Sequence, residues 1–122
     1  MVNKQDYLNA ITQNIDMVRG DTLAFNFQLS GLGSREAYEA LTARFAVAEN
    51  YDMDPECEIT TEDGIELVEY TEDTATFSVC LSPDMTADMI PARYVYDLQI
   101  EDESNVITLM RGVLTLLYEV AK

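Results

Sequence analysis

Residues 22–30 read TLAFNFQLS, and this alternating stretch decides the fold class of the chain. Apolar side chains occupy every second position: Leu23, Phe25, Phe27 and Leu29. In an extended strand these four residues share one face, and the small or polar residues between them share the other. Aromatic and large apolar residues in this pattern are typical of a half-buried strand.

The same alternation returns in residues 74–81 and 93–101. Their predicted inward residues are Ala75, Phe77, Val79 and Leu81 in the first segment and Tyr94, Tyr96, Leu98 and Ile100 in the second. Weaker strands are expected at residues 15–18, 43–48, 66–70, 106–110 and 113–120. Gly112 would mark a bend or bulge between the last two, and polar residues 101–105 read as a hairpin loop.

Short helical elements interrupt this pattern. Ser34 can cap a turn over residues 35–41, and Ser82 followed by Pro83 suits the start of a second turn. Residues 1–14 are expected to form a short helix or an irregular arm. The sequence thus predicts residues 15–122 as an all-β domain, an immunoglobulin-like antiparallel β-sandwich of about seven or eight strands.

Composition narrows the range of functions. The chain has 122 residues, which suits a single domain, and 23 acidic residues against 7 basic ones give a formal net charge of −16. Such a surface repels phosphate backbones and anionic lipids, so neither nucleic acid nor membrane is expected as a partner. The sequence also lacks a signal-like start and a long apolar run, so we expect a soluble protein made in the cytoplasm of its host cell.

The residue types for common catalysis are missing. The chain has no histidine, the commonest general base and metal ligand, and so we predict no enzyme, no cofactor, no catalytic site and no metal site. Asp52, Asp54 and Glu56 read as a solvated acidic loop, although binding of a cation there stays open. Cys57 and Cys80 lack metal-type spacing and read as ordinary thiols, although their count also permits a disulfide.

The final strand carries apolar residues on both faces. Leu114, Leu116, Tyr118 and Val120 are expected to face the core. The opposite face would then be covered by an N-terminal helix or by another subunit. The candidate interface residues are Tyr7, Leu8, Ile11, Val113 and Leu117, and a homo-oligomer is expected.

Several segments, in order, resemble a known family. Residues 18–22 (VRGDT), followed by Phe25 and Phe27, resemble the opening of the N-terminal domain of phage baseplate upper proteins. Residues 81–86 (LSPDMT) resemble the capped turn that follows a central strand in that family.

The second half of the chain continues the resemblance. Residues 94–100 (YVYDLQI) are similar to the family's most recognisable strand, and residues 108–109 and 112–115 are similar to its closing hairpin. The resemblance implies an immunoglobulin-like domain that helps to assemble a tail or baseplate, usually as an oligomer. Two departures are Ala92, where a glycine is expected, and the end of the sequence at Lys122, where the family continues into a stalk or docking region.

Three functional hypotheses follow. The first is a virion structural module of the tail or baseplate that assembles with other virion or phage proteins. The second is an acidic inhibitor that mimics nucleic acid to block a host DNA-binding or defence protein, which predicts that acids cluster on one face. The third is an enzyme that uses carboxylates alone, which requires a concave pocket with paired acids.

Overall fold

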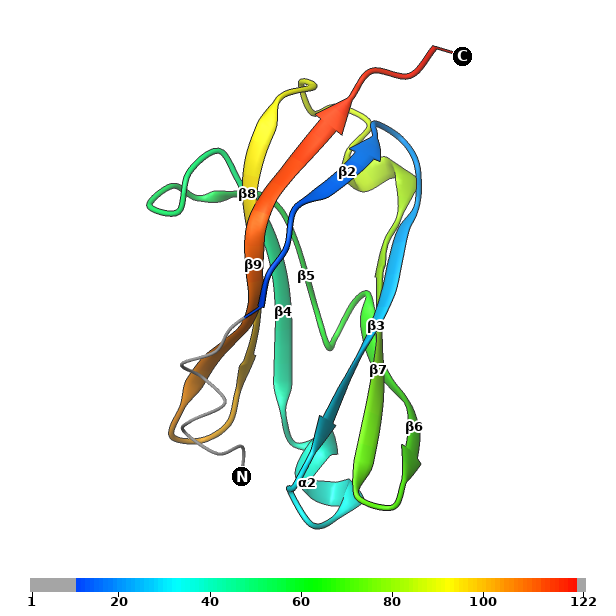
Figure 1. Ribbon diagram of the computed structural model, residues 1–122, viewed down its shortest axis with the longest axis vertical. Helices are drawn as coiled ribbons and strands as arrows, with labels where there is room; N and C mark the ends of the chain where they lie inside the picture. Colours follow the sequence, from blue (N-terminus) through cyan, green and yellow to red (C-terminus); the bar gives the residue numbers. More distant parts are fainter. Residues whose placement is uncertain (1–10, 121–122) are drawn as a thin grey trace.

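The computed structural model describes residues 11–120, which form an all-β sandwich of two sheets (Figure 1). Nine strands are present in this range: β1 (Ile11–Thr12), β2 (Ile15–Val18), β3 (Leu23–Ser30), β4 (Thr42–Ala48), β5 (Pro55–Thr60), β6 (Ile65–Thr71), β7 (Thr74–Leu81), β8 (Arg93–Glu101) and β9 (Val106–Leu117). A short helix, α2 (Arg35–Glu39), and a 3₁₀ turn, η1 (Pro83–Met85), connect strands of different sheets. The predicted fold class is confirmed.

The two sheets are unequal. The larger has the order β1-β9-β8-β4-β5, with β2 also paired to β9, and the smaller has the order β3-β7-β6. Neighbouring strands are antiparallel, as predicted, except β1 and β2, which run parallel to β9. The assignment to the immunoglobulin-like class stays a prediction.

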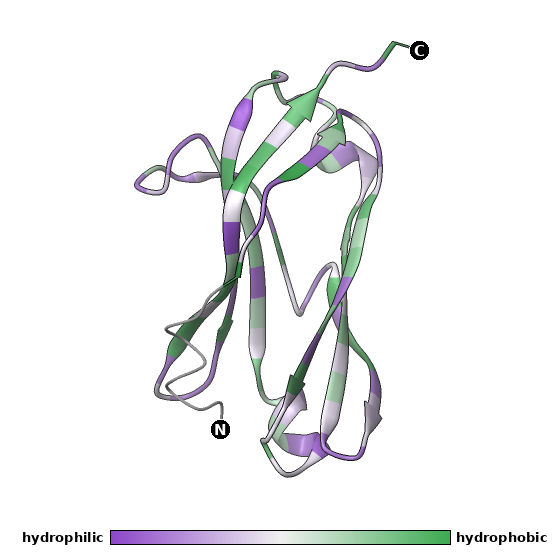
Figure 2. Ribbon diagram, in the orientation of Figure 1, coloured by the Kyte–Doolittle hydropathy of each residue, from purple (hydrophilic) through white to green (hydrophobic). Residues whose placement is uncertain are grey.

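The three alternating segments of the sequence became β3, β7 and β8. Their predicted inward residues on β7 and β8 are all buried, and Figure 2 shows hydrophobic and hydrophilic residues alternating along β3. On β3, however, Leu23, Phe25 and Phe27 are only half-buried. This difference arises because β3 lies at the edge of its sheet, where one side of each inward side chain is left uncovered.

Two features of the strands differ from the sequence prediction. β5 was not predicted, because Glu56 and Glu58 alternate with the buried Cys57 and Ile59 and give the segment the composition of an acidic loop. The two strands predicted on either side of Gly112 are one continuous strand, β9.

The irregularity in β9 lies elsewhere than predicted. The pairing with β8 shifts between Leu98, opposite Met110, and Gln99, opposite Thr108, which leaves Leu109 as the extra residue. Gly112 itself is in regular register opposite Tyr96.

β9 also ends earlier than predicted. Leu114 and Leu116 are buried as expected, but Tyr118 and Val120 lie beyond the strand and are exposed, so they do not face the core. Arg19 holds this end of the chain, because its guanidinium pairs with the Glu119 carboxylate at 2.6 Å and lies 5.7 Å from the centroid of the Tyr118 ring.

Strands, not a helix, cover the outer edge of β9. In the predicted N-terminal helix or arm, Ile11 and Thr12 form strand β1 of the larger sheet, Gln13 and Asn14 hydrogen-bond to β9, and the rest of that segment lies outside the described residues. The Gln13 carbonyl accepts a hydrogen bond of 2.6 Å from the Tyr96 hydroxyl, and the Gln13 amide donates to the Arg111 carbonyl at 2.9 Å. A Cβ added to Gly112 would lie 2.1 Å from the Gln13 carbonyl oxygen. Glycine is therefore required there for close approach of two backbones, not for a bend.

A hydrogen-bond network at Asp73 fixes the far end of β3. The Asp73 carboxylate accepts bonds from the amides of Gly31 and Gly33, at 3.1 and 2.8 Å, and from the hydroxyl of the fully buried Tyr38, at 2.9 Å. Burial raises the pKa of the Tyr38 hydroxyl, so it remains a donor across the physiological pH range. The network ties the end of β3, helix α2 and the β6–β7 turn together.

We predict that Gly112→Ala destabilises the fold by about 3 kcal/mol, because the new methyl group must displace the backbone of Gln13. Gly20→Ala is the matched control. Gly20 has φ +83° but nothing within 4 Å of an added Cβ, so its cost is confined to backbone strain of about 1 kcal/mol. Urea denaturation measures both values, and equal losses in the two variants would contradict the close-contact explanation.

The β6–β7 turn yields a second prediction. Glu72 and Asp73 both have positive φ, 52° and 58°, in a two-residue hairpin loop. Glu72→Gly should raise the free energy of unfolding by about 0.5 kcal/mol, because glycine adopts this conformation without strain. Asp73→Gly should instead lower it by about 1 kcal/mol, because the amides of Gly31 and Gly33 lose their acceptor, while the Tyr38 hydroxyl keeps the main-chain carbonyl of residue 73. Thermal unfolding of the two variants distinguishes them, and a gain at both positions would show that the Asp73 network contributes little.

Candidate docking groove

β3 presents an unpaired edge. It bonds to β7 along its whole length, from Leu23 opposite Leu81 to Ser30 opposite Thr74. No strand within residues 11–120 pairs with its other edge. A row of backbone donors and acceptors that faces away from its own sheet is a ready site for strand addition.

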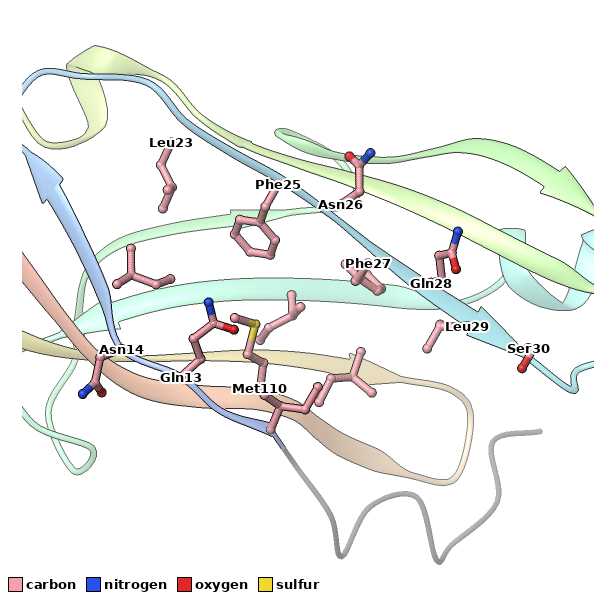
Figure 3. A pocket seen from close by; sticks show the side chains of 14 residues that line it. Gln13, Asn14, Leu23, Phe25, Asn26, Phe27, Gln28, Leu29, Ser30 and Met110 are labelled. Carbon is pink, nitrogen blue, oxygen red and sulfur yellow. The ribbon is translucent and has the colours of Figure 1, made fainter.

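A groove of about 840 Å³ runs beside this edge, between the two sheets. We call it the β3 groove. It is lined by β3, by the first residues of the larger sheet and by the inner faces of β8 and β9: Ile11, Gln13, Asn14, Ile15, Leu23, Phe25, Asn26, Phe27, Gln28, Leu29, Ser30, Leu98, Leu109 and Met110. Figure 3 shows Leu23, Phe25 and Phe27 along one wall, with Gln13 and Met110 on the facing wall.

The aromatic wall of the groove is held in place by rings of the core. Phe25 meets Phe45 edge-on at a centroid distance of 5.7 Å, and Phe27 stacks on Phe77 at 5.0 Å. Each ring therefore has one side packed against the core and another side facing the groove. The apolar wall is thus pre-organised for binding, because its rings need not be reoriented.

The β3 edge is uncharged, unlike the edges on the other side of the sandwich. No charged residue occurs between Asp21 and Arg35. By contrast, β5 carries Pro55, Glu56 and Glu58, and β6 carries Glu66 and Glu69. Proline and charged side chains are the usual protection of an edge strand against pairing with another chain. Two edges are thus protected, while the eight residues of β3 are not.

The acids concentrate around the protected edges. Residues 49–73 contain eleven acidic residues and no lysine or arginine. Two arginines of the larger sheet contact this segment. Arg44 pairs with Glu58, and Arg111 lies 4.2 Å from the centroid of the Tyr51 ring. Arg19 and Arg35 pair with carboxylates as well.

The predicted interface residues are not gathered into one patch. Tyr7 and Leu8 lie outside the described residues. Ile11 lines the β3 groove and is 61% exposed, Val113 is half-buried, and Leu117 is 43% exposed at the far end of β9. Ile11 pairs with Met110, well before Leu117 along β9, so only Ile11 of the three belongs to the groove.

The groove-lining residues Phe25 and Phe27 were predicted to share one face of a half-buried strand and were not among the candidate interface residues. The alternating pattern identified their shared face but not its partial exposure. One signal was present in the sequence, namely the absence of charge from Thr22 to Ser34 across a predicted strand.

The other candidate sites do not bring metal-ligating or catalytic side chains together in a buried place. Within the described residues, no group of three acidic or cysteine side chains lies close enough to hold a metal ion, and Asp52, Asp54 and Glu56 are all exposed. A smaller hollow of about 290 Å³ is lined by Glu62, Glu66 and Cys80 among others, and both carboxylates are exposed. Exposed acids lack the desolvation that separates the roles of a catalytic carboxylate pair.

The comparisons with known proteins leave the chain without an assigned family. No family model matches it, and no curated protein matches it significantly. No helix in residues 11–120 has the length and apolar character needed to cross a membrane.

The two thiols provide a prediction. Both cysteines are free, Cys57 buried and Cys80 exposed, and burial raises the pKa of Cys57 to about 11. Because the thiolate is the reactive form, Cys57 should resist alkylation at pH 8 while Cys80 is modified. Mass spectrometry after iodoacetamide treatment should find one label in the folded protein and two after unfolding in urea. Rapid double labelling of the folded protein would show that β5 does not hold Cys57 in the core.

Proposed function

We propose that this chain is a non-enzymatic structural module of a phage or prophage tail or baseplate, acting by protein–protein assembly through the β3 groove. The observation that carries the binding role is the combination of an unpaired, uncharged strand edge with an apolar groove beside it. The chain protects its other long edges with acids, so the unprotected edge is best explained by a partner that covers it.

Sequence resemblance supports the choice of a tail or baseplate. The segments that resemble the N-terminal domain of phage baseplate upper proteins occupy the β2–β3 turn and β3, the η1 turn, β8 and β9. These elements lie on or next to the β3 groove or the end of the sandwich above it (Figure 1). On this proposal the protein is made in the bacterial host cytoplasm and becomes part of the virion.

A second candidate function is supported by the acidic segment. Eleven of the 23 acidic residues of the chain lie in residues 49–73, which include β5 and β6 and the loops beside them. A dense acidic segment of this kind is what an acidic inhibitor of a DNA-binding or defence protein would present. Edge protection accounts for several of these acids without a partner, and for this reason the assembly role is preferred.

The two functions differ in their dependence on salt. Binding of a basic protein to the acidic segment should weaken steeply as salt rises, because screening removes the attraction. Assembly through the uncharged β3 groove should not weaken in this way. A binding titration at low and moderate ionic strength therefore separates them.

We predict that Gln28→Lys, on the exposed face of β3, prevents incorporation into particles while the domain stays folded. An edge lysine opposes strand addition, and loss of the hydrogen bond that the Gln28 side-chain amide donates to the Thr76 hydroxyl at 3.2 Å should cost about 1 kcal/mol. The measurement is quantitative mass spectrometry of purified virions from cells that express the variant.

Thr71→Lys is the matched control, because Thr71 is an exposed residue on β6, the protected edge of the same sheet. It should be incorporated at the wild-type level. Absence of the wild-type chain from virions would overturn the tail assignment, and equal incorporation of both lysine variants would overturn the role of the β3 edge.

A further inference from the structure

We infer that the partner at the β3 edge is β3 of a second copy of this chain, paired antiparallel about Asn26 in a twofold dimer. This inference rests on the proposed function, since it takes the β3 edge to be an assembly surface. It adds the identity of the partner and the register of the pairing.

The sequence of β3 is nearly the same in both directions. Reading outward from Asn26, the neighbours are Phe25 and Phe27, and three positions away are Leu23 and Leu29. The one unlike pair consists of Ala24 and Gln28, both exposed and on the face away from the core.

This symmetry suits an antiparallel pairing of two identical strands. With Asn26 opposite Asn26 of the second copy, Phe25 lies opposite Phe27 of the second copy, and Leu23 lies opposite Leu29. Side chains directly opposite each other share a face, with Cβ atoms about 4.5–5.5 Å apart. The groove face would thus be lined by phenylalanine beside phenylalanine and leucine beside leucine.

The pairing would also cover the exposed parts of the aromatic wall. Phe25 and Phe27 are half-buried, and each already has its far side fixed by Phe45 or Phe77. Apposed rings from a second copy would complete their burial and join the two smaller sheets into one sheet with the order β6-β7-β3-β3-β7-β6. Closed twofold symmetry requires such a self-complementary patch, which the β3 sequence supplies.

The charge distribution allows a second copy to bind at this edge. Two chains of net charge −16 repel each other, so they can associate only where the negative charge is lowest. The stretch from Thr22 to Ser34 is the longest uncharged run at any strand edge, and the pairing places the acid-rich β5 and β6 at the outer ends of the dimer. Association should consequently strengthen when salt screens the repulsion.

Light scattering combined with size-exclusion chromatography tests the inference on the full chain. The wild type should have the mass of two chains, more completely at moderate than at low salt. Asn26→Lys should weaken the dimer about tenfold or more, because it places two like charges directly opposite each other. Asn26→Glu should have the same effect. An equimolar mixture of the two variants should recover the dimer, because lysine then faces glutamate.

A cross-link tests the register independently. In a Cys80→Ser background, Asn26→Cys should form a disulfide-linked dimer on mild oxidation, because the two thiols meet at the twofold axis. Ser30→Cys is the control on the same strand, since Ser30 of one copy would lie about 27 Å from Ser30 of the other in this register. Only the first variant should cross-link rapidly.

The outcomes separate this inference from the proposed function. A wild-type chain that remains a monomer at every salt concentration overturns the self-pairing, as does failure of the mixed lysine and glutamate variants to recover the dimer. If the chain is a monomer and Gln28→Lys still blocks incorporation into virions, the β3 edge binds another protein and the proposed function stands. If a symmetric dimer forms but the chain is absent from virions, the inference about the edge stands and the tail assignment fails.

Discussion

The contact between the backbone of Gln13 and Gly112 is the constraint on which the open side of the sandwich depends. At this point the N-terminal segment lies directly on β9, close enough to exclude even a methyl group, and the Tyr96 hydroxyl holds the Gln13 carbonyl from within the core. The following residues continue along β9 as β2. Because this part of the chain is committed to the larger sheet, it cannot pair with β3. The smaller sheet therefore has three described strands, and its β3 edge is left open.

The open edge is nevertheless a fixed one. At one end, β3 begins just after the turn where the Gly20 amide donates to Thr86 and Arg19 pairs with Glu119. At the other end, the Asp73 carboxylate holds the loop that follows Ser30. Between these anchors the strand is bonded to β7 over eight residues. Because the β3 edge is already ordered, little conformational entropy of β3 would be lost when a partner strand binds, and this pre-organisation favours binding.

The alternating residues of β3, β7 and β8 were sufficient to predict an all-β sandwich, because a period of two determines which residues share a face. The same local signal could not predict how the strands pair. The parallel pairing of β2 with β9 depends on contacts between residues about a hundred positions apart, such as Ile15 with Leu114. Gly112 was taken for a bend or bulge on the same local grounds. The need for glycine there comes from the backbone of Gln13, which is distant in the sequence, and not from the neighbouring residues of β9. β5 was missed because its outward glutamates resemble loop residues, although Cys57 and Ile59 are buried.

The candidate site was only partly predictable. Ile11, a predicted interface residue, lines the groove, but Phe25 and Phe27 were predicted only to share one face of a half-buried strand, since a sequence pattern shows the face on which a residue lies and not whether a neighbouring strand covers it. Exposure of their rings follows from the order of strands in the smaller sheet. The lack of charge along β3 was visible in the sequence, but its meaning required knowing that β3 is an edge.

The parallel arrangement of β2 and β9 has a mechanical consequence. With β1 included, the parallel ladder on β9 runs from Ile11 opposite Met110 to Val18 opposite Leu117, so Ile11 and Leu117 lie at opposite ends of it (Figure 1). A force that pulls these two points apart would slide the strands along each other and load all of their hydrogen bonds at once, as in shear. An antiparallel hairpin pulled at its open end instead separates one bond at a time. The sandwich is therefore built to resist tension applied along its long axis, which is the direction in which a component linked at both ends of its chain would be stretched.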